Sequence, residues 1–163
     1  MKAASIGDIK QELSNLPPAK LLELCLRLAK YKKDNKELLN YLLFEAHDEQ
    51  AYIINIKNEV EEDFAAINKS NVYFAKKSLR KILRTLAKHI RYTASKQAEV
   101  ELLLHFCSTL KNSSIPLQRN TVLNNLYQYQ IKKVAKVIAT LHEDLQYDYL
   151  KDLDKLTGHL KLT

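Results

Sequence analysis

Apolar residues recur at intervals of three and four positions along most of the chain, which is the spacing of one face of an α-helix. The clearest stripe consists of Ile53, Ile56, Val60, Phe64 and Ile67. Similar stripes precede and follow it, each separated from the next by a short polar joint. The pattern therefore predicts a succession of amphipathic helices joined by short connections.

The ends of these helices are marked by residues that favour helix termini. Pro18 suits the first turn of a helix, where its missing N–H costs nothing, and Asp34 with Glu37 has the spacing of a capping box. Ser95 is placed to cap a helix, and residues 112–116 form the clearest loop. The predicted helices cover about 6–14, 18–33, 34–44, 49–67, 72–92, 96–110 and 120–145, and the tail 148–160 is predicted as a short last helix, capped at Gly158, or as an extension of the seventh.

Composition strengthens the helical interpretation. The 163 residues include only two glycines and three prolines, and β-rich folds depend on glycine in their tight turns. We predict an all-α fold of seven or eight antiparallel helices, arranged as a compact bundle or a short stack of helical hairpins. The length predicts a single helical domain over residues 1–163.

The location of the protein is predicted from what its sequence does not show. The N-terminus carries charge before any apolar run develops, and no stretch is long enough to span a bilayer. Cys25 and Cys107 each lie among leucines on a helical pattern, which predicts two buried, reduced thiols. We therefore expect a soluble protein in the cytoplasm.

Charge is distributed unevenly along the chain. The net charge is +7, and residues 71–111 alone carry 9 Lys/Arg against 2 Asp/Glu. On a helical wheel, seven cations of this segment fall within an arc of about 140°, opposite an apolar stripe. We predict that this face is a polyanion-binding site if the protein has one; it comprises Lys76, Lys77, Arg80, Lys81, Arg84, Lys88 and Arg91.

Three explanations of the basic face stay open at this stage. Solvent and salt can screen it without any partner. The acidic residues Glu59, Glu61, Glu62 and Asp63 of the preceding helix can neutralise it within the chain. Alternatively, a nucleic acid, an anionic membrane surface or an acidic protein can bind to it. Tyrosines at both ends, Tyr73 and Tyr92, and a second basic patch at Lys132, Lys133 and Lys136 favour nucleic acid, but no helix-turn-helix pattern accompanies them.

No catalytic, cofactor or metal site is predicted. The residues around His47 point in different directions on a helix, so they do not converge on an ion. Glu101 and His105 share a helix face and form a plausible exposed pair, but no second such pair appears. Neither glycine has a partner at the spacing of a phosphate-binding loop.

The N-terminal third also shows a resemblance. Its leucine spacing, in residues 9–24 and 35–42, resembles the opening of some uncharacterised helical bacterial proteins of unknown function. The resemblance implies no activity and no site residues.

Two functions are predicted from these features. The first is a non-enzymatic helical interaction module that presents a surface to another macromolecule or to its own copy. The alternative is a sequence-independent nucleic-acid-binding protein that uses the basic face of the helix at 72–92.

Overall fold

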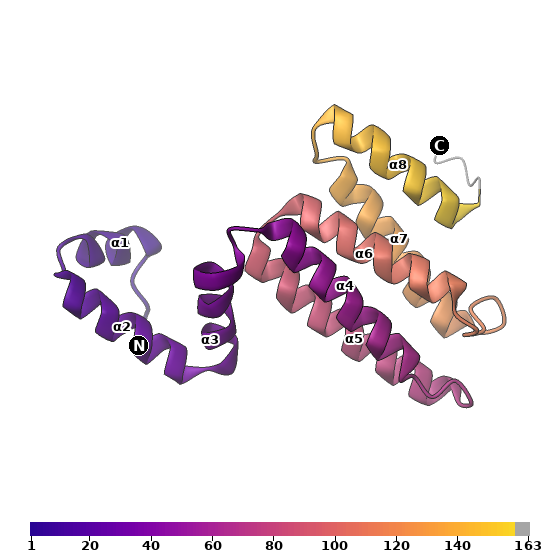
Figure 1. Cartoon of the computed structure of the whole chain (residues 1–163), viewed down its shortest axis with the longest axis horizontal. Coiled ribbons are helices and arrows are strands. Elements are labelled where there is room, and N and C mark those ends of the chain that lie inside the picture. Colours follow the sequence, from indigo (N-terminus) through magenta and orange to yellow (C-terminus); the bar gives the residue numbers. More distant parts are fainter. Residues whose placement is uncertain (159–163) are drawn as a thin grey trace. The chain divides into compact units, whose positions relative to one another are not determined.

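The computed structural model describes residues 1–158, and this part of the chain is all-α, with eight α-helices and no strand (Figure 1). This confirms the predicted fold class. Contacts between residues divide the chain into two compact units, Met1–Glu45 and Ala46–Thr163. The sequence-based expectation of one domain over residues 1–163 stays a prediction.

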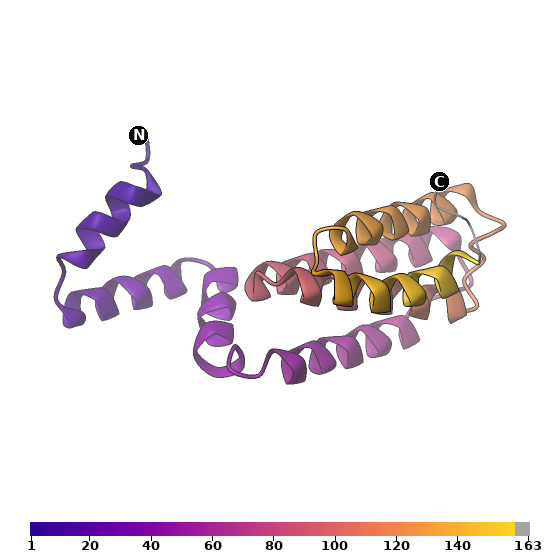
Figure 2. The same ribbon diagram turned by 90° about the horizontal axis from the view of Figure 1, so that it is seen from above.

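The N-terminal unit contains three α-helices and one wider helical turn. Ser5 and Asp8 cap the first helix reciprocally, and Pro18 occupies the first turn of the second. The second and third helices pack against each other. Figure 2 shows the first and third helices at opposite ends of the second. The elements are α1 (Ile6–Ser14), α2 (Pro18–Tyr31), α3 (Lys33–Asn40) and the π-helical turn η1 (Tyr41–Glu45).

The C-terminal unit is a bundle of five helices around α6. This helix contacts each of the other four, and its apolar residues are buried on nearly every side, as expected of a central helix. Phe64 of α4 packs on Phe106 of α6 with ring centroids 5.4 Å apart. The helices are α4 (Glu49–Ala65), α5 (Val72–Thr93), α6 (Lys96–Asn112), α7 (Thr121–Ile138) and α8 (Glu143–Thr157).

Most of the predicted helix ends are confirmed. Asp48, Asn71, Ser95 and Asn120 cap α4 to α7 by accepting a hydrogen bond from a backbone N–H of the first turn. Gly158 ends α8 in the left-handed conformation, with φ of 61°. The predicted tail helix at 148–160 extends past Gly158, and residues 159–163 lie outside the described part of the chain.

Three local predictions are wrong. Asp34 does not cap α3, because that helix already begins at Lys33. The seventh helix ends at Ile138 rather than near residue 145, and the side chain of His142 caps a separate α8. Cys25 is exposed, although Cys107 is buried as expected. In each case the local sequence pattern was compatible with both outcomes.

Candidate functional site

The basic face of α5 forms as the sequence predicts. Ala75, Leu79, Ile82 and Leu86 are buried on one side of the helix. The opposite side carries the seven cations, of which Lys76 and Lys88 are half-buried and Lys77, Arg80, Lys81, Arg84 and Arg91 are exposed. The face is therefore available to a large polyanion.

The neighbouring acidic residues neutralise this face only at one point. Lys88 lies close enough to Glu59 to lower its pKa, although burial and the nearby carboxylates of Asp63 and Glu62 raise that pKa overall. Glu61 lies instead beside His105 on α6. Within residues 1–158, the six other cations of the face make no ion pair with an acidic side chain. The acidic residues of the chain therefore do not neutralise most of the cations on this face.

The two tyrosines at the ends of α5 have different environments. Tyr73 is 61% exposed and contacts Phe74 with ring centroids 5.6 Å apart. Tyr92 is buried against the His89 ring. Only Tyr73 is therefore placed to stack on a base or another flat group.

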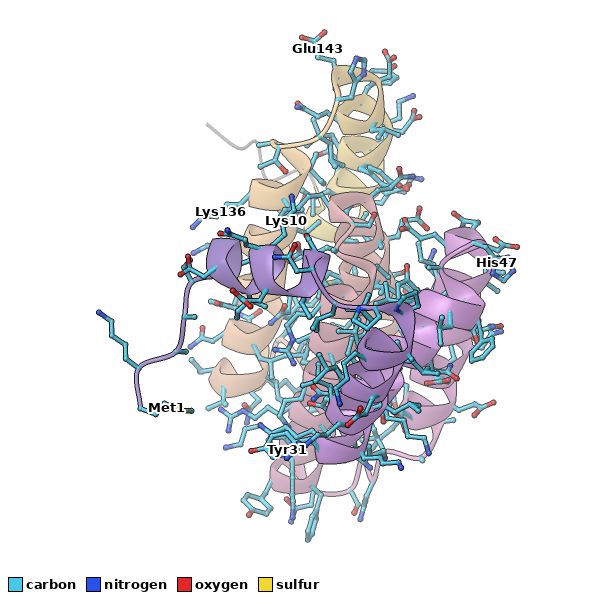
Figure 3. The ribbon with its side chains drawn as sticks, turned by 90° about the vertical axis from the view of Figure 1, so that its left-hand side faces the viewer. Met1, Lys10, Tyr31, His47, Lys136 and Glu143 are labelled. Atoms are coloured by element: carbon cyan, nitrogen blue, oxygen red, sulfur yellow. The ribbon has the colours of Figure 1, made fainter. Side chains whose placement is uncertain are left out.

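The basic face continues past the end of α5. Arg91, Lys96 and Lys133 line a cavity of about 380 Å³ that joins the ends of α5 and α6 to α7. Glu99 lies in the same cavity, 3.4 Å from Lys133 and 3.6 Å from Lys96, so it neutralises part of the charge. The exposed Lys136 side chain lies on α7 (Figure 3). The predicted second basic patch is thus adjacent to the first at this end.

A polar cluster between α4, α6 and α8 was not predicted. Glu101 accepts hydrogen bonds from Lys57 and from the Tyr149 hydroxyl, both at 3.0 Å, and Gln97 is 3.4 Å away. Lys57, Glu101 and Tyr149 line part of a cavity of about 460 Å³. The signal that could have indicated the cluster is a tyrosine and a lysine at otherwise core-facing positions of α8 and α4.

The electrostatics of this cluster favour an ionised Glu101. Burial alone would raise the pKa of Glu101, but the hydrogen bond and charge of Lys57, with the Tyr149 hydroxyl, lower it overall. Burial and the hydrogen bond to Glu101 raise the pKa of Tyr149 to about 12. Tyr149 therefore stays a neutral donor, and the cluster is a structural ion pair with its hydrogen bonds satisfied.

The sequence suggested that His105 and Glu101 form an exposed pair. In the structure His105 does not pair with Glu101, and its side chain is half-buried. Its Nε2 atom is buried and lies 3.4 Å from a Glu61 oxygen without forming a hydrogen bond. Burial, with the charge of Lys57, lowers the pKa of His105 although Glu61 opposes this. The imidazole is therefore neutral at pH 7, and two side chains are too few for a metal site.

The N-terminal unit exposes an unusual amount of apolar surface. Its one buried apolar residue is Tyr41. Eleven large apolar side chains between Ile6 and Phe44 are exposed by 36% to 82%. Summed over the three elements that carry these side chains, this is roughly 1,000 Å² of exposed apolar surface. Figure 3 shows one member, Tyr31, at the end of α2.

Part of this surface is a groove between α2 and α3, with a volume of about 600 Å³. Leu26, Ala29, Leu39, Leu43 and Phe44 form its apolar lining. Lys30, Lys32, Lys33 and Lys36 lie along its rim. Of these four, Lys33 forms an ion pair with Glu37 at 3.6 Å, and within residues 1–158 the other three have no acidic partner. The groove thus combines an apolar floor with a cationic edge.

Residues that could hold a metal do not gather in the described part of the chain. Between Met1 and Gly158 no three His, Cys, Asp or Glu side chains form a group suited to a metal ion. His47 is exposed before α4 (Figure 3), and the adjacent Asp48 is engaged in capping that helix. Over the same residues, no helix has both the length and the apolar character needed to cross a bilayer.

Comparison with protein-family models, with curated proteins and with solved structures found no match. The resemblance of the N-terminal third to uncharacterised bacterial proteins therefore stays a prediction.

Proposed function

We propose that the protein is a helical interaction module whose N-terminal unit binds another protein chain through its apolar surface. The observation that carries the proposal is the exposure of the amphipathic faces of α1, α2 and η1. Exposed apolar surface of this extent is typical of protein interfaces rather than of monomer surfaces. A stable interface uses about 800 Å² from each partner, which this unit can supply.

The size of the unit supports the same conclusion. Its 45 residues, Met1–Glu45, bury almost no apolar side chain among themselves. Chains of this length need an external support to stay folded, such as a metal, a disulfide or a partner. Isolated helices of 9 to 14 residues, the lengths of α1 and α2, are marginal in water. A partner that covers the apolar faces would supply the missing stabilisation.

Photo-crosslinking in cells that express the protein tests this proposal. We would place p-benzoylphenylalanine at Leu22, which is 60% exposed on α2, and in a control at Tyr129, which is 66% exposed on α7. The proposal predicts a discrete crosslinked product from position 22 and none from position 129. Its mass tells whether the second chain is a copy or a different protein. Absence of any product from position 22 would refute the proposal.

The second candidate function is sequence-independent binding of nucleic acid by α5. It is favoured by one observation, the six cations of the basic face that have no acidic partner within residues 1–158. Such a face would contact phosphates, so its affinity would depend steeply on salt but little on sequence. The two functions use different units and are therefore testable separately.

A further inference from the structure

We propose that two copies of the chain form a dimer in which α1 of each copy docks into the α2–α3 groove of the other. This inference rests on the proposed function and names its partner. In the helix-in-groove mode of recognition, apolar anchors spaced at i, i+3 or i+4, and i+7 enter an apolar groove. The N-terminal unit carries both halves of such an interaction.

The anchors lie on α1. Ile6, Ile9 and Leu13 have the spacing i, i+3 and i+7, and fall within about 60° of one another on the helix. Ile6 is 82% exposed, and Ile9 and Leu13 are exposed by about 40%. The capping box at Ser5 and Asp8 fixes the start of the helix. This short helix therefore presents an apolar stripe that is largely open at Ile6 and partly covered at Ile9 and Leu13.

The charges of α1 and of the groove are complementary. Glu12 lies on one flank of the apolar stripe and Lys10 lies on the other, whereas Asp8 is engaged in the capping box with Ser5. The rim of the groove carries Lys30, Lys32 and Lys36, which have no acidic partner within residues 1–158. Docking with the apolar stripe down would bring the acidic flank near the cationic rim. The Glu12 carboxylate would therefore favour the docking orientation that places its own flank, and not that of Lys10, beside the lysines.

The groove of the same chain does not hold α1. Figures 1 and 2 show α1 attached at the N-terminal end of α2 and α3 at its C-terminal end. The residues that line the groove belong to the C-terminal part of α2, to α3 and to η1. The exposure of Ile6 and Leu43 shows that anchor and groove are both open. In a second copy of the chain, α1 is available to fill this groove, and helix and groove are always present in equal number.

Reciprocal docking gives a closed two-fold dimer, the commonest form of oligomer. Each copy gives one helix and one groove, so both sets of exposed side chains are covered together. The anchors and the groove belong to an exposed apolar surface on the order of 1,000 Å² per copy, against about 800 Å² that each partner contributes to a standard interface. Residues 1–45 carry 8 Lys/Arg and 6 Asp/Glu, so the small net charge of the unit opposes association only weakly.

Sedimentation equilibrium of the full chain provides the first test. The wild type is expected to be dimeric at tens of micromolar. Ile9→Asp on α1 and Leu43→Asp in the groove should each weaken the dimer at least tenfold. Ile54→Asp is the matched control, because Ile54 is similarly exposed on α4. A monomeric wild type, or a dimer unaffected by both variants, would overturn the proposal.

Mixing the two variants tests the reciprocal geometry. The Ile9→Asp chain keeps an intact groove, and the Leu43→Asp chain keeps an intact α1. Where each substitution abolishes the docking site that it alters, each variant alone has no intact site and the mixture keeps one, so the mixture should form a heterodimer at concentrations where each variant alone is monomeric. A mixture that stays monomeric would show that the grooves meet face to face or that α1 binds its own chain, and would reject this geometry.

Reversing the charge of exposed residues tests the docking orientation without altering apolar packing, so loss of folding does not confuse the result. Glu12→Lys should weaken the dimer about fivefold, and Lys32→Glu with Lys36→Glu in the same chain should restore it. No restoration would contradict the docking orientation. If the wild type is monomeric but position 22 crosslinks to a different protein in cells, the interaction function stands and only the dimer fails. If neither occurs, both fail.

Discussion

At the scale of single residues, Glu101 forms a partly buried ion pair with Lys57 and accepts a hydrogen bond from the Tyr149 hydroxyl. Both side chains of the ion pair are largely shielded, with exposed fractions of 13% and 27%. Removing one partner would leave the other buried without compensation, which costs more than the pair contributes as a whole. The cluster thus connects α6 to α4 and to α8 through hydrogen bonds, and its role is to stabilise the fold.

Replacing Lys57 should destabilise the protein in a pH-dependent way. We expect Lys57→Met to lower the free energy of unfolding at pH 7 by about 1 to 3 kcal/mol, because Glu101 loses its charged donor. The pKa of Glu101 is lowered in the folded state, so its stabilising contribution is present above the unfolded value of 4.5 and is lost as the pH falls through the folded value. The difference between wild type and variant should therefore shrink below about pH 4.

Urea denaturation at a series of pH values measures this effect. Lys20→Met is the matched control, because Lys20 and Glu23 are as close, at 2.7 Å, but both are well exposed. Exposed pairs contribute little, so the control should differ from wild type by less than about 0.5 kcal/mol. Equal effects of the two substitutions, or a Lys57→Met effect that does not change with pH, would contradict the structural role given to the cluster.

At the scale of elements, α5 and α6 show what a helical pattern can predict. The separation of cations from core residues on α5 was foreseen, because charge and apolar character alternate at helical spacing. The absence of acidic partners for six of these cations within residues 1–158 was not foreseen, because it depends on the direction in which the carboxylates of α4 point. Glu61, for example, turns toward His105 rather than toward α5.

The exposed faces of α1 and α2 show where such prediction ends. The pattern correctly indicated amphipathic helices at Ile6–Ser14 and Pro18–Tyr31. It also suggested that Cys25 is buried, because a leucine-rich stripe usually faces a core. A stripe does not specify whether its cover comes from the same chain or from another. For this reason the α2–α3 groove could not be predicted from the pattern alone.

If α5 binds nucleic acid, charge reversal on its face should abolish binding. We expect Arg80→Glu with Arg84→Glu to reduce affinity for a fluorescent 20-nucleotide duplex at least tenfold at low salt, because phosphate contacts dominate such binding. The wild-type affinity should fall steeply with salt, and anisotropy titrations at several salt concentrations measure both effects.

The control changes the same charge elsewhere. Arg119→Glu with Lys151→Glu alters exposed cations of the loop before α7 and of α8, and should leave most of the affinity intact. Equal losses from both double variants would indicate a general charge effect. No binding of the wild type to duplex or single strand at low salt would remove this candidate function.

At the scale of the whole molecule, the two units differ in how they are stabilised. The unit Ala46–Thr163 has a core built around α6, where Leu102, Phe106 and Leu110 are fully buried. The unit Met1–Glu45 buries almost none of its own apolar side chains. Local stability follows the number of buried apolar contacts. The C-terminal unit should therefore stay folded alone, whereas the N-terminal unit should depend on association with a partner.

Amide hydrogen exchange of the full chain, measured by mass spectrometry at a high and a low protein concentration, tests this dependence directly. At concentrations that favour the dimer, amides of α2 and α3 should be protected, and on dilution they should exchange at least tenfold faster. Amides of α6 should exchange at the same slow rate at both concentrations. Equal protection of α2 and α3 at both concentrations would contradict the account, because the N-terminal unit would then be stable without a partner.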